Sequence, residues 1–351
     1  MSETTDGARR SPGAYPRVTV LLAAYNEEKY VQQAIEPLLA QQYQGELEII
    51  LSDDRSPDHT FEVMRRVASE YRGPHTVVLN QNPTNLGILG HFDYVARKLV
   101  HGDIIVFHGG DDIARPGYIQ TVADAFLEHP ECVYASFAFT PINEVGEVIG
   151  PSSAGLGTGI QRFTRSDYFA GRFGWSGGPA SAFRREVISR FASPAPNRGA
   201  YQESLILYRS LCLGEVCFFK KDVIFYRRHN RSVSVSFKPQ NRPELMEGVY
   251  RQAHTDVDRA LEEHLLSEEE AALFHRSVDR EDHFNRLRRL YESRGFLGKQ
   301  GVLLRTLFSS QINLRQKLSF IWNRIPGLAA VRSAVRRAVR SAVSRAMHGR
   351  K

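Results

Sequence analysis

Short apolar runs alternate with helical segments over the first 140 residues, and this alternation limits the fold more than any other feature. Runs of Ile, Leu, Val and Phe that end in small residues are typical of buried strands. Strands that alternate with helices form a mostly parallel sheet with right-handed crossovers. We therefore expect an α/β fold whose mostly parallel sheet is flanked by helices. The expected strands are residues 18–23, 47–52, 76–79, 103–110 and 133–137, and the expected helices are 27–42, 58–71, 90–99 and 116–128.

Two pairs of adjacent aspartates, Asp53-Asp54 and Asp111-Asp112, follow two of these apolar runs. Ligands of open α/β sheets bind at the carboxyl ends of the strands. Carboxylates placed there can read a nucleotide and hold a divalent cation against its phosphates. An aspartate after a strand can also cap a helix or form a turn, and Asp58 fits that alternative better. Two pairs at equivalent strand ends favour a ligand site.

The composition is that of a globular protein. The chain has 351 residues, of which 42% are hydrophobic and 24% are charged, enough for one large domain with an appendage or two modest domains. Cys132, Cys212 and Cys217 lack metal-ligand spacing and indicate buried free thiols in a reducing compartment. No apolar run reaches about 18 residues, so we expect no transmembrane helix. The polar lead-in 1–16 predicts a disordered start of a cytoplasmic protein.

The formal charge of +7 is unevenly distributed. All 39 acidic residues lie at or before Glu292, whereas 13 of the 46 basic residues follow it, so residues 1–292 carry a formal charge of about −6. The segment from Pro239 to about Arg294 is rich in charged residues, and its pattern predicts helices and no strands. Residues 1–292 are therefore mildly acidic, and residues 293–351 are strongly basic.

The tail 326–351 consists almost entirely of Ala, Val, Arg and Ser. Val331, Val335 and Val339 recur every four positions beside a stripe of arginines, which predicts an amphipathic helix. This pattern favours peripheral binding to anionic lipid, at about 1 kcal/mol for each basic residue near the surface. A helix packed on the body or a solvated tail is the alternative. Basic residues without interleaved aromatic residues argue against a nucleic-acid partner.

Seven motifs occur in a fixed order between residues 18 and 236. They are residues 18–28, 52–60, 85–87, 109–112, 178–185, the Gln202-Glu203 pair with Arg209, and 226–234. In this order they resemble the inverting glycosyltransferases of family 2, which have the GT-A (Rossmann-like) nucleotide-sugar-binding fold. The resemblance implies transfer of one sugar from a UDP-, dTDP- or GDP-linked donor to a hydroxyl of a cell-envelope acceptor, either a lipid-linked glycan or a polysaccharide. Processive synthases carry a Q-x-x-R-W motif that this chain lacks.

The resemblance also implies a domain organisation. Residues 17–238 would form the GT-A domain, 239–294 a charged helical segment, and 295–351 basic amphipathic C-terminal helices. An enzyme of this kind would act in the cytoplasm, held peripherally at the inner face of the cell membrane.

Roles for the aspartate pairs follow from the resemblance. Asp54 would accept the imide N–H of the base, with Asp53 supporting it. Asp112 would be the direct ligand of Mn²⁺ or Mg²⁺, with Asp111 beside it on the ribose or a metal-bound water. Such a cation neutralises the charge that gathers on the diphosphate leaving group. The wall of the nucleotide pocket would comprise Ala23, Tyr25 and Glu27.

Later motifs supply the remaining candidates. Glu203 would be the catalytic base that takes the proton of the acceptor hydroxyl; a solvent-facing glutamate is the alternative. His229 would reach the metal or the diphosphate, unless it is a plain surface histidine. Arg227 and Arg228 would contact phosphate. The acceptor would be bordered by Trp175, Gly177 and Gly178, although a tryptophan at such a position is often simply packed.

Three positions depart from the family pattern. Gly109 stands where the family often has a first acid, Gln202-Glu203 replaces the commoner Glu-Asp pair, and Asp93 stands where Asn is common. These departures keep an alternative open, a non-catalytic module of the same fold that binds a nucleotide-sugar or a lipid surface. A sugar-nucleotide pyrophosphorylase would need a Gly-rich N-terminal phosphate loop, which residues 25–28 do not provide.

Overall fold

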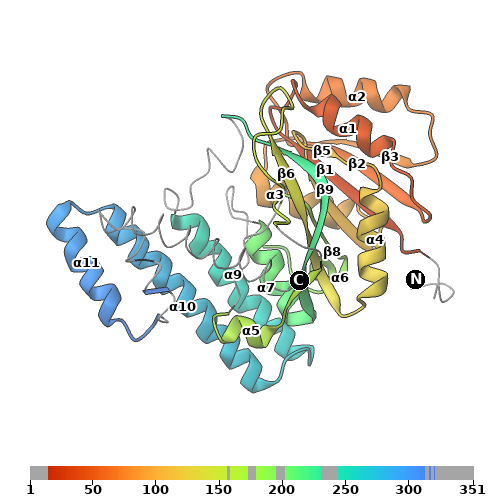
Figure 1. Cartoon of the computed structure of the whole chain (residues 1–351). Coiled ribbons are helices and arrows are strands. Elements are labelled where there is room, and N and C mark those ends of the chain that lie inside the picture. The colour runs from red at the N-terminus through yellow and green to blue at the C-terminus, as the bar shows by residue number, and fades with distance from the viewer. Residues whose placement is uncertain are drawn as a thin grey trace, which may run out of the picture. The chain divides into compact units, whose positions relative to one another are not determined.

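The computed structural model describes residues 15–312 except 156–158, 173–178, 195–201 and 231–242, together with residues 316, 317 and 320. The chain divides into two units, Met1–His275 and Arg276–Lys351. The first unit contains the sheet (Figure 1). The expectations for residues 1–14 and for the tail 326–351 fall on parts of the chain outside the described residues.

The sheet has nine strands in the order β3-β2-β1-β4-β8-β6-β9-β5, with β7 paired to β9. Its first four strands are parallel neighbours, and the sequence predicted all four. In the second half, β6 and β9 are parallel, whereas β8, β5 and β7 pair in the antiparallel sense. The sheet is therefore mixed, and the expected parallel arrangement is confirmed for its first half. The strands are β1 (Val18–Ala24), β2 (Leu47–Asp53), β3 (Thr76–Gln81), β4 (Ile104–Gly109), β5 (Ile113–Ala114), β6 (Cys132–Ile142), β7 (Ile160–Phe163), β8 (Ser181–Arg184) and β9 (Glu215–Arg227).

Helices cover both faces of the first four strands. The predicted crossover helices are present as α1 (Val31–Leu39), α2 (Thr60–Glu70), α3 (Gly87–Lys98) and α4 (Tyr118–Glu128). The apolar faces of α1, α2 and α4 share one core with alternate residues of β1, β2 and β4. The opposite face carries Phe107, whose ring packs edge-on against Phe92 of α3 at 5.9 Å between centroids. Burial on both faces explains why β1, β2 and β4 appear in the sequence as mostly apolar runs.

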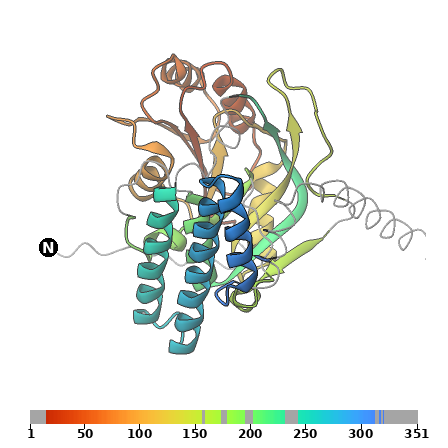
Figure 2. The same ribbon diagram turned by 90° about the vertical axis from the view of Figure 1, so that its left-hand side faces the viewer.

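The rest of the first unit is built on helices that pack beside the sheet, namely α5 (Arg165–Phe169), α6 (Glu186–Ser189), α7 (Gln202–Leu213) and α9 (Pro243–Glu262). A buried ion pair joins α7 to α9, because Arg209 Nε lies 2.7 Å from Asp256 Oδ2. The start of α10 (Glu268–Glu292) lies beside α9, with 2.7 Å between the Nδ1 atoms of His254 and His275 (Figures 1 and 2).

The second unit contains the end of α10 and α11 (Phe296–Phe308). Its small core consists of Val302, Leu303 and Phe320, with Phe284 and Tyr291 packed against it. Among the described residues, none of the helices combines the length and the apolar character that crossing a membrane requires.

Strands β7, β8 and β9 and helix α5 were not predicted from the sequence. The Gly/Ser-rich segment after residue 143, in which no helix or strand was expected, contains β7 and α5. Strand β8 was not predicted because its four residues are too few to show a period. The 13-residue strand β9 was not predicted, because Lys220-Lys221-Asp222 interrupts its apolar residues.

Candidate active site

The carboxyl ends of β2 and β4 bring the two aspartate pairs to the same edge of the sheet. Strand β1 lies between them. The N–H of Asp54 donates to the carbonyl of Ala24, and the N–H of Gly110 donates to the carbonyl of Ala23, each at 3.0 Å. The segments that follow β2 and β4 are therefore held against adjacent residues of β1. The expected convergence of the two pairs is confirmed.

The loop after β1 is held by side chains of the segment after β2. Asn26 has a φ of 64°, a left-handed conformation that asparagine tolerates better than most residues. This turn exposes three successive backbone N–H groups to polar side chains of the second motif. The three pairs are Asn26 to Ser56 Oγ at 2.9 Å, Glu27 to Thr60 Oγ1 at 2.8 Å, and Glu28 to Asp58 Oδ2 at 3.2 Å. Two motifs that are separate in sequence thus form one structure.

Glu27, Asp111 and His229 form a cluster at this edge, which we call the cation cluster. One ligand atom from each residue lies within 4.8 Å of the other two. His229 Nε2 is 2.9 Å from Asp111 Oδ2 and 3.9 Å from Glu27 Oε2, and the His229 side chain is 3% exposed. The hydrogen bond to the Asp111 carboxylate raises the pKa of His229 despite its burial. Two carboxylates and an imidazole are a donor set that fits a divalent cation.

Asp112 lies outside the cation cluster, contrary to the expectation that it is the direct ligand. Its side chain is buried, and its Oδ1 accepts the backbone N–H of Arg227 at 3.0 Å. Burial and the neighbouring Asp111 raise its pKa well above the usual range, against the opposing effect of Arg227. Of the two acids, Asp111 is the one whose carboxylate lies in the cluster, whereas Asp112 accepts a backbone hydrogen bond from the end of β9.

Gly109 occupies the position where the family often has its first acid. A Cβ atom built there would lie 2.8 Å from Asp111 Oδ1 and 3.1 Å from Asp112 Oδ2. A side chain at this position would press on both carboxylates. With any other residue at this position, one or both carboxylates would have to shift.

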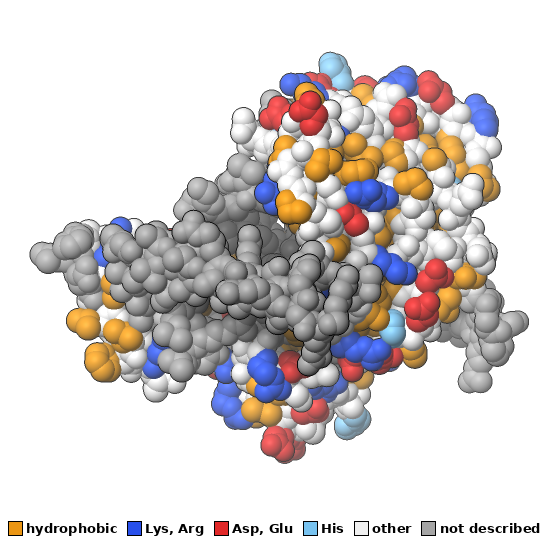
Figure 3. Space-filling view, viewed as in Figure 1, with side chains coloured by type: hydrophobic (Ala, Val, Ile, Leu, Met, Phe, Trp, Pro, Cys, Tyr) orange, Lys and Arg blue, Asp and Glu red, His pale blue; other side chains and the backbone are white. Residues whose placement is uncertain are grey.

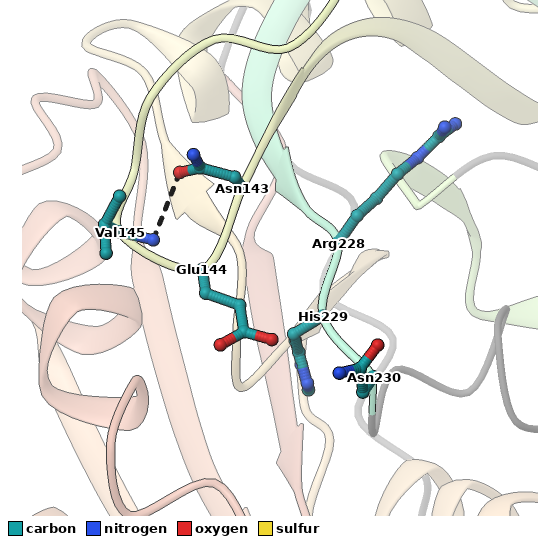
Figure 4. A pocket seen from close by; sticks show the side chains of 6 residues that line it. All are labelled: Asn143, Glu144, Val145, Arg228, His229 and Asn230. Atoms are coloured by element: carbon teal, nitrogen blue, oxygen red, sulfur yellow. Dashed lines mark hydrogen bonds between the residues drawn. The ribbon is translucent and has the colours of Figure 1, made fainter.

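Arg227 is fully buried, so the expected phosphate contact is not open to it. Its guanidinium donates to protein oxygens instead, including the carbonyls of Asp111 and Glu144. The neighbouring Arg228 is exposed, and its side chain points away from His229 (Figure 4).

Asp53 and Asp54 both bind protein donors. Asp53 accepts hydrogen bonds from Ser56 and Gln81. Asp54 is 3% exposed, and its two oxygens accept the Asn82 amide and two backbone N–H groups at the start of α3, each at 2.8 Å. The helix-capping alternative thus describes part of what Asp54 does. Tyr25, in contrast, is 49% exposed beside this edge.

Two cavities border the cation cluster, and Glu144, His229 and Asn230 line both of them. The smaller, of about 200 Å³, is completed by residues 26–30. The larger, of about 380 Å³, is completed by Asn143, Val145 and Arg228. Figure 4 shows the Glu144 carboxylate and the His229 ring side by side at this cavity. Glu144 was missed from sequence, because it lies in an expected loop where no periodic pattern marks a residue.

The remaining candidates lie partly or wholly outside what the structure describes. Glu203 is the second residue of α7, but its side chain is outside the description. Trp175, Gly177 and Gly178 fall in the undescribed segment 173–178. On the face seen in Figure 3, acidic and basic side chains of the described residues are interspersed, and these residues form no continuous basic patch there.

Comparisons with known proteins identify relatives of the first unit. Residues 19–191 match the family model for glycosyl transferase family 2. EpsE of Bacillus subtilis is 33% identical over 113 residues, which are 32% of this chain and 39% of EpsE. The poly(ribitol-phosphate) beta-N-acetylglucosaminyltransferase TarS of Staphylococcus aureus is 28% identical over 114 residues, which are 32% of this chain and 19% of TarS. The chain thus spans well under half the length of either relative.

The fold agrees with these matches. The crystal structure of S. aureus TarS 1-349 in complex with UDP-GlcNAc superposes with a TM-score of 0.57 at 16% identity, covering 86% of this chain and 82% of that one. At this identity the likeness concerns the fold alone, and it confirms the expected GT-A fold with C-terminal helices. The family match shows that residues 19–191 of the chain form a glycosyl transferase family 2 domain.

Proposed function

We propose that this chain transfers a single sugar, with inversion, from a nucleoside-diphosphate-sugar to a hydroxyl of a cell-envelope glycan. The observation that carries the proposal is the cation cluster of Glu27, Asp111 and His229, which lies at the sheet edge where such folds bind ligands. TarS was crystallised with UDP-GlcNAc and with UDP, which makes UDP-linked sugars the first donors to test. The family match supports the class of reaction.

The cation cluster would hold a divalent cation, and Mn²⁺ suits it better than Mg²⁺. Mg²⁺ prefers oxygen ligands and keeps several waters, whereas an imidazole nitrogen suits the transition metals. When bound, the cation would neutralise the negative charge of the departing diphosphate. Glu27 and Asp111 supply the carboxylate oxygens, and His229 supplies the nitrogen.

Residues around the cluster would bind the rest of the donor. The exposed ring of Tyr25 would stack on the base, beside Ala23. A carboxylate has about four acceptor positions, and three of those on Asp54 are filled by protein donors. The fourth would accept the imide N–H of the base. Arg228, exposed at the larger cavity, would contact the phosphates or the acceptor.

Glu203 would act as the general base. Its carboxylate would take the proton of the acceptor hydroxyl as the hydroxyl oxygen attacks the anomeric carbon. The bond from that carbon to the diphosphate oxygen breaks on the opposite face, and the nucleoside diphosphate leaves with the electron pair. The acceptor would be bordered by Trp175, Gly177 and Gly178. The basic tail 326–351 would hold the enzyme at an anionic membrane surface, on the cytoplasmic side where nucleotide-sugars are made available.

Thermal unfolding with and without Mn²⁺ tests the donor and cation assignments together. A ligand at about 100 times its Kd stabilises the folded state by about 2.7 kcal/mol, so UDP-sugars should raise the Tm only when Mn²⁺ is present. Asp111→Asn should remove this Mn²⁺-dependent rise. Asp124→Asn, on the remote helix α4 where Asp124 bonds only locally to Gln120, should retain it.

A second measurement separates catalysis from binding. Glu203→Gln should bind Mn²⁺ and the donor as before but lose turnover, measured as release of UDP in the presence of an acceptor glycan. Full turnover in Glu203→Gln would refute the base assignment. An unchanged Mn²⁺-dependent Tm rise in Asp111→Asn would refute the cation assignment.

A further inference from the structure

Arg227, the last residue of β9, is 0% exposed and forms a hub behind the cation cluster. Its Nε donates to the carbonyl of Asp111 at 2.9 Å, and its Nη1 donates to the carbonyls of Glu144 at 2.8 Å and Asn143 at 3.3 Å. Its Nη2 donates to Gln33 Oε1 at 2.7 Å. The guanidinium thus joins three segments, namely the end of β4, the turn after β6 and helix α1.

Arg227 is connected to both Asp111 and His229 of the cation cluster. Asp111 is held twice, through its carbonyl by Arg227 and through its carboxylate by His229, two residues further along the chain. The backbone N–H of Arg227 also donates to Asp112 Oδ1. The Tyr30 ring contacts the guanidinium at 4.8 Å and the His229 ring at 4.9 Å. Asp111 and His229 therefore both depend on where Arg227 lies.

The chemistry of these contacts requires a guanidinium. All four acceptors are neutral amide oxygens, and they surround the group in different directions. Arginine presents five donors in a rigid planar fork, whereas lysine presents three donors at a single point. A lysine at this position cannot reach Asp111, Glu144 and Gln33 at once.

We propose that Arg227 is a positioning residue that sets the spacing of the cation cluster by fixing the main chain of Asp111 and the turn at Glu144. This inference rests on the proposed cation site. Residues that orient metal ligands in this indirect way change metal affinity by about 10- to 100-fold when they are substituted.

Mn²⁺ binding by the full chain tests the inference, with Mn²⁺ alone as the probe. Free and bound Mn²⁺ are measured by electron paramagnetic resonance. Arg227→Lys should weaken Mn²⁺ binding by about 10- to 100-fold and change the spectrum of the bound ion. Arg227→Ala should show the same loss, and millimolar guanidinium should restore a large part of it by filling the vacated space.

Arg184 offers a matched control. Its guanidinium also donates to three main-chain carbonyls, those of Cys132, Phe126 and Pro130, and it lies over the Phe126 ring at 5.3 Å. It pairs with Ile104, at the opposite end of β4 from Asp111. Arg184→Lys should therefore lower the Tm while leaving Mn²⁺ affinity within about twofold of wild type, because it loses similar bonds remote from the ligands.

The outcomes separate this inference from the proposed function. If the wild-type chain binds no Mn²⁺, the cation assignment fails and the inference fails with it. If the wild type binds Mn²⁺ and Arg227→Lys binds it equally well with an unchanged spectrum, only the positioning role is refuted. If Arg184→Lys weakens Mn²⁺ binding as much as Arg227→Lys does, the loss reflects general destabilisation, which also refutes the positioning role. Should Arg227→Ala fail to fold, the Arg227→Lys comparison decides.

Discussion

His108 makes the stability of this protein depend on pH in a way that can be calculated from the structure. The side chain belongs to β4, is fully buried, and donates from Nε2 to the carbonyl of Asp112 at 3.3 Å. Its Nδ1 has no hydrogen-bond partner among the described residues. Burial lowers the pKa of His108 from 6.5 to about 4. The folded state therefore favours the neutral ring.

The sign follows from this lowered pKa. The unfolded chain takes up the proton as the pH falls through about 6.5, whereas the folded chain takes it up only near pH 4. The contribution of His108 to the free energy of unfolding is complete above its pKa in the unfolded chain. It declines as the pH falls toward the pKa of His108 in the folded chain. At about 1.4 kcal/mol per pKa unit, the loss between about pH 7.5 and pH 5 is about 2 kcal/mol, and it approaches about 3 kcal/mol at lower pH.

Urea unfolding of wild type and His108→Gln at both pH values measures this contribution. Glutamine keeps a donor near the Asp112 carbonyl but does not titrate. Between about pH 7.5 and about pH 5, the stability of the His108→Gln variant should therefore fall by about 2 kcal/mol less than that of wild type. Other titrating groups contribute equally to both proteins and cancel in the comparison. His59→Gln, which replaces an exposed ring, should behave as wild type. Equal pH dependence in wild type and His108→Gln would show that His108 is not held neutral by burial.

Three further predictions follow from packing and charge. Asp256→Ala should cost about 3–5 kcal/mol in urea unfolding, because Arg209 is left buried without its carboxylate; the double change with Arg209→Met should cost much less, and equal costs would contradict the pairing. Gly110→Ala should cost about 1–3 kcal/mol, since the added Cβ would lie 2.6 Å from the Cβ of Ala24, and an unchanged Tm would contradict this close approach. Removal of residues 326–351 should release the protein from anionic vesicles at low salt in a flotation assay, and undiminished binding would refute a lipid-binding tail.

Local sequence was sufficient for β1 to β4 and their crossover helices. Strands β1, β2 and β4 are buried on both faces, so most of their residues are apolar and the pattern can be read without knowing the partners. The same information failed for β9, in which Lys220-Lys221-Asp222 interrupts the apolar residues. It also failed for β8, where four residues are too few to show a period. Strands of these kinds are defined by the neighbours with which they pair, and those neighbours lie far away in sequence.

The placement of the two aspartate pairs at one sheet edge could be predicted, because parallel strands in an α/β fold end at a common edge. Which carboxylate faces the cluster could not. Asp111 and Asp112 are adjacent in sequence and chemically identical, and the choice depends on contacts made by β9 more than 110 residues later. There, the backbone N–H of Arg227 draws Asp112 into the interior, while His229 holds Asp111 at the cavity. Glu144 lines the same cavity, and the turn after β6 that carries it is bonded to Arg227. The kinds of group in the site are thus encoded locally, whereas their orientation depends on hydrogen bonds between distant segments.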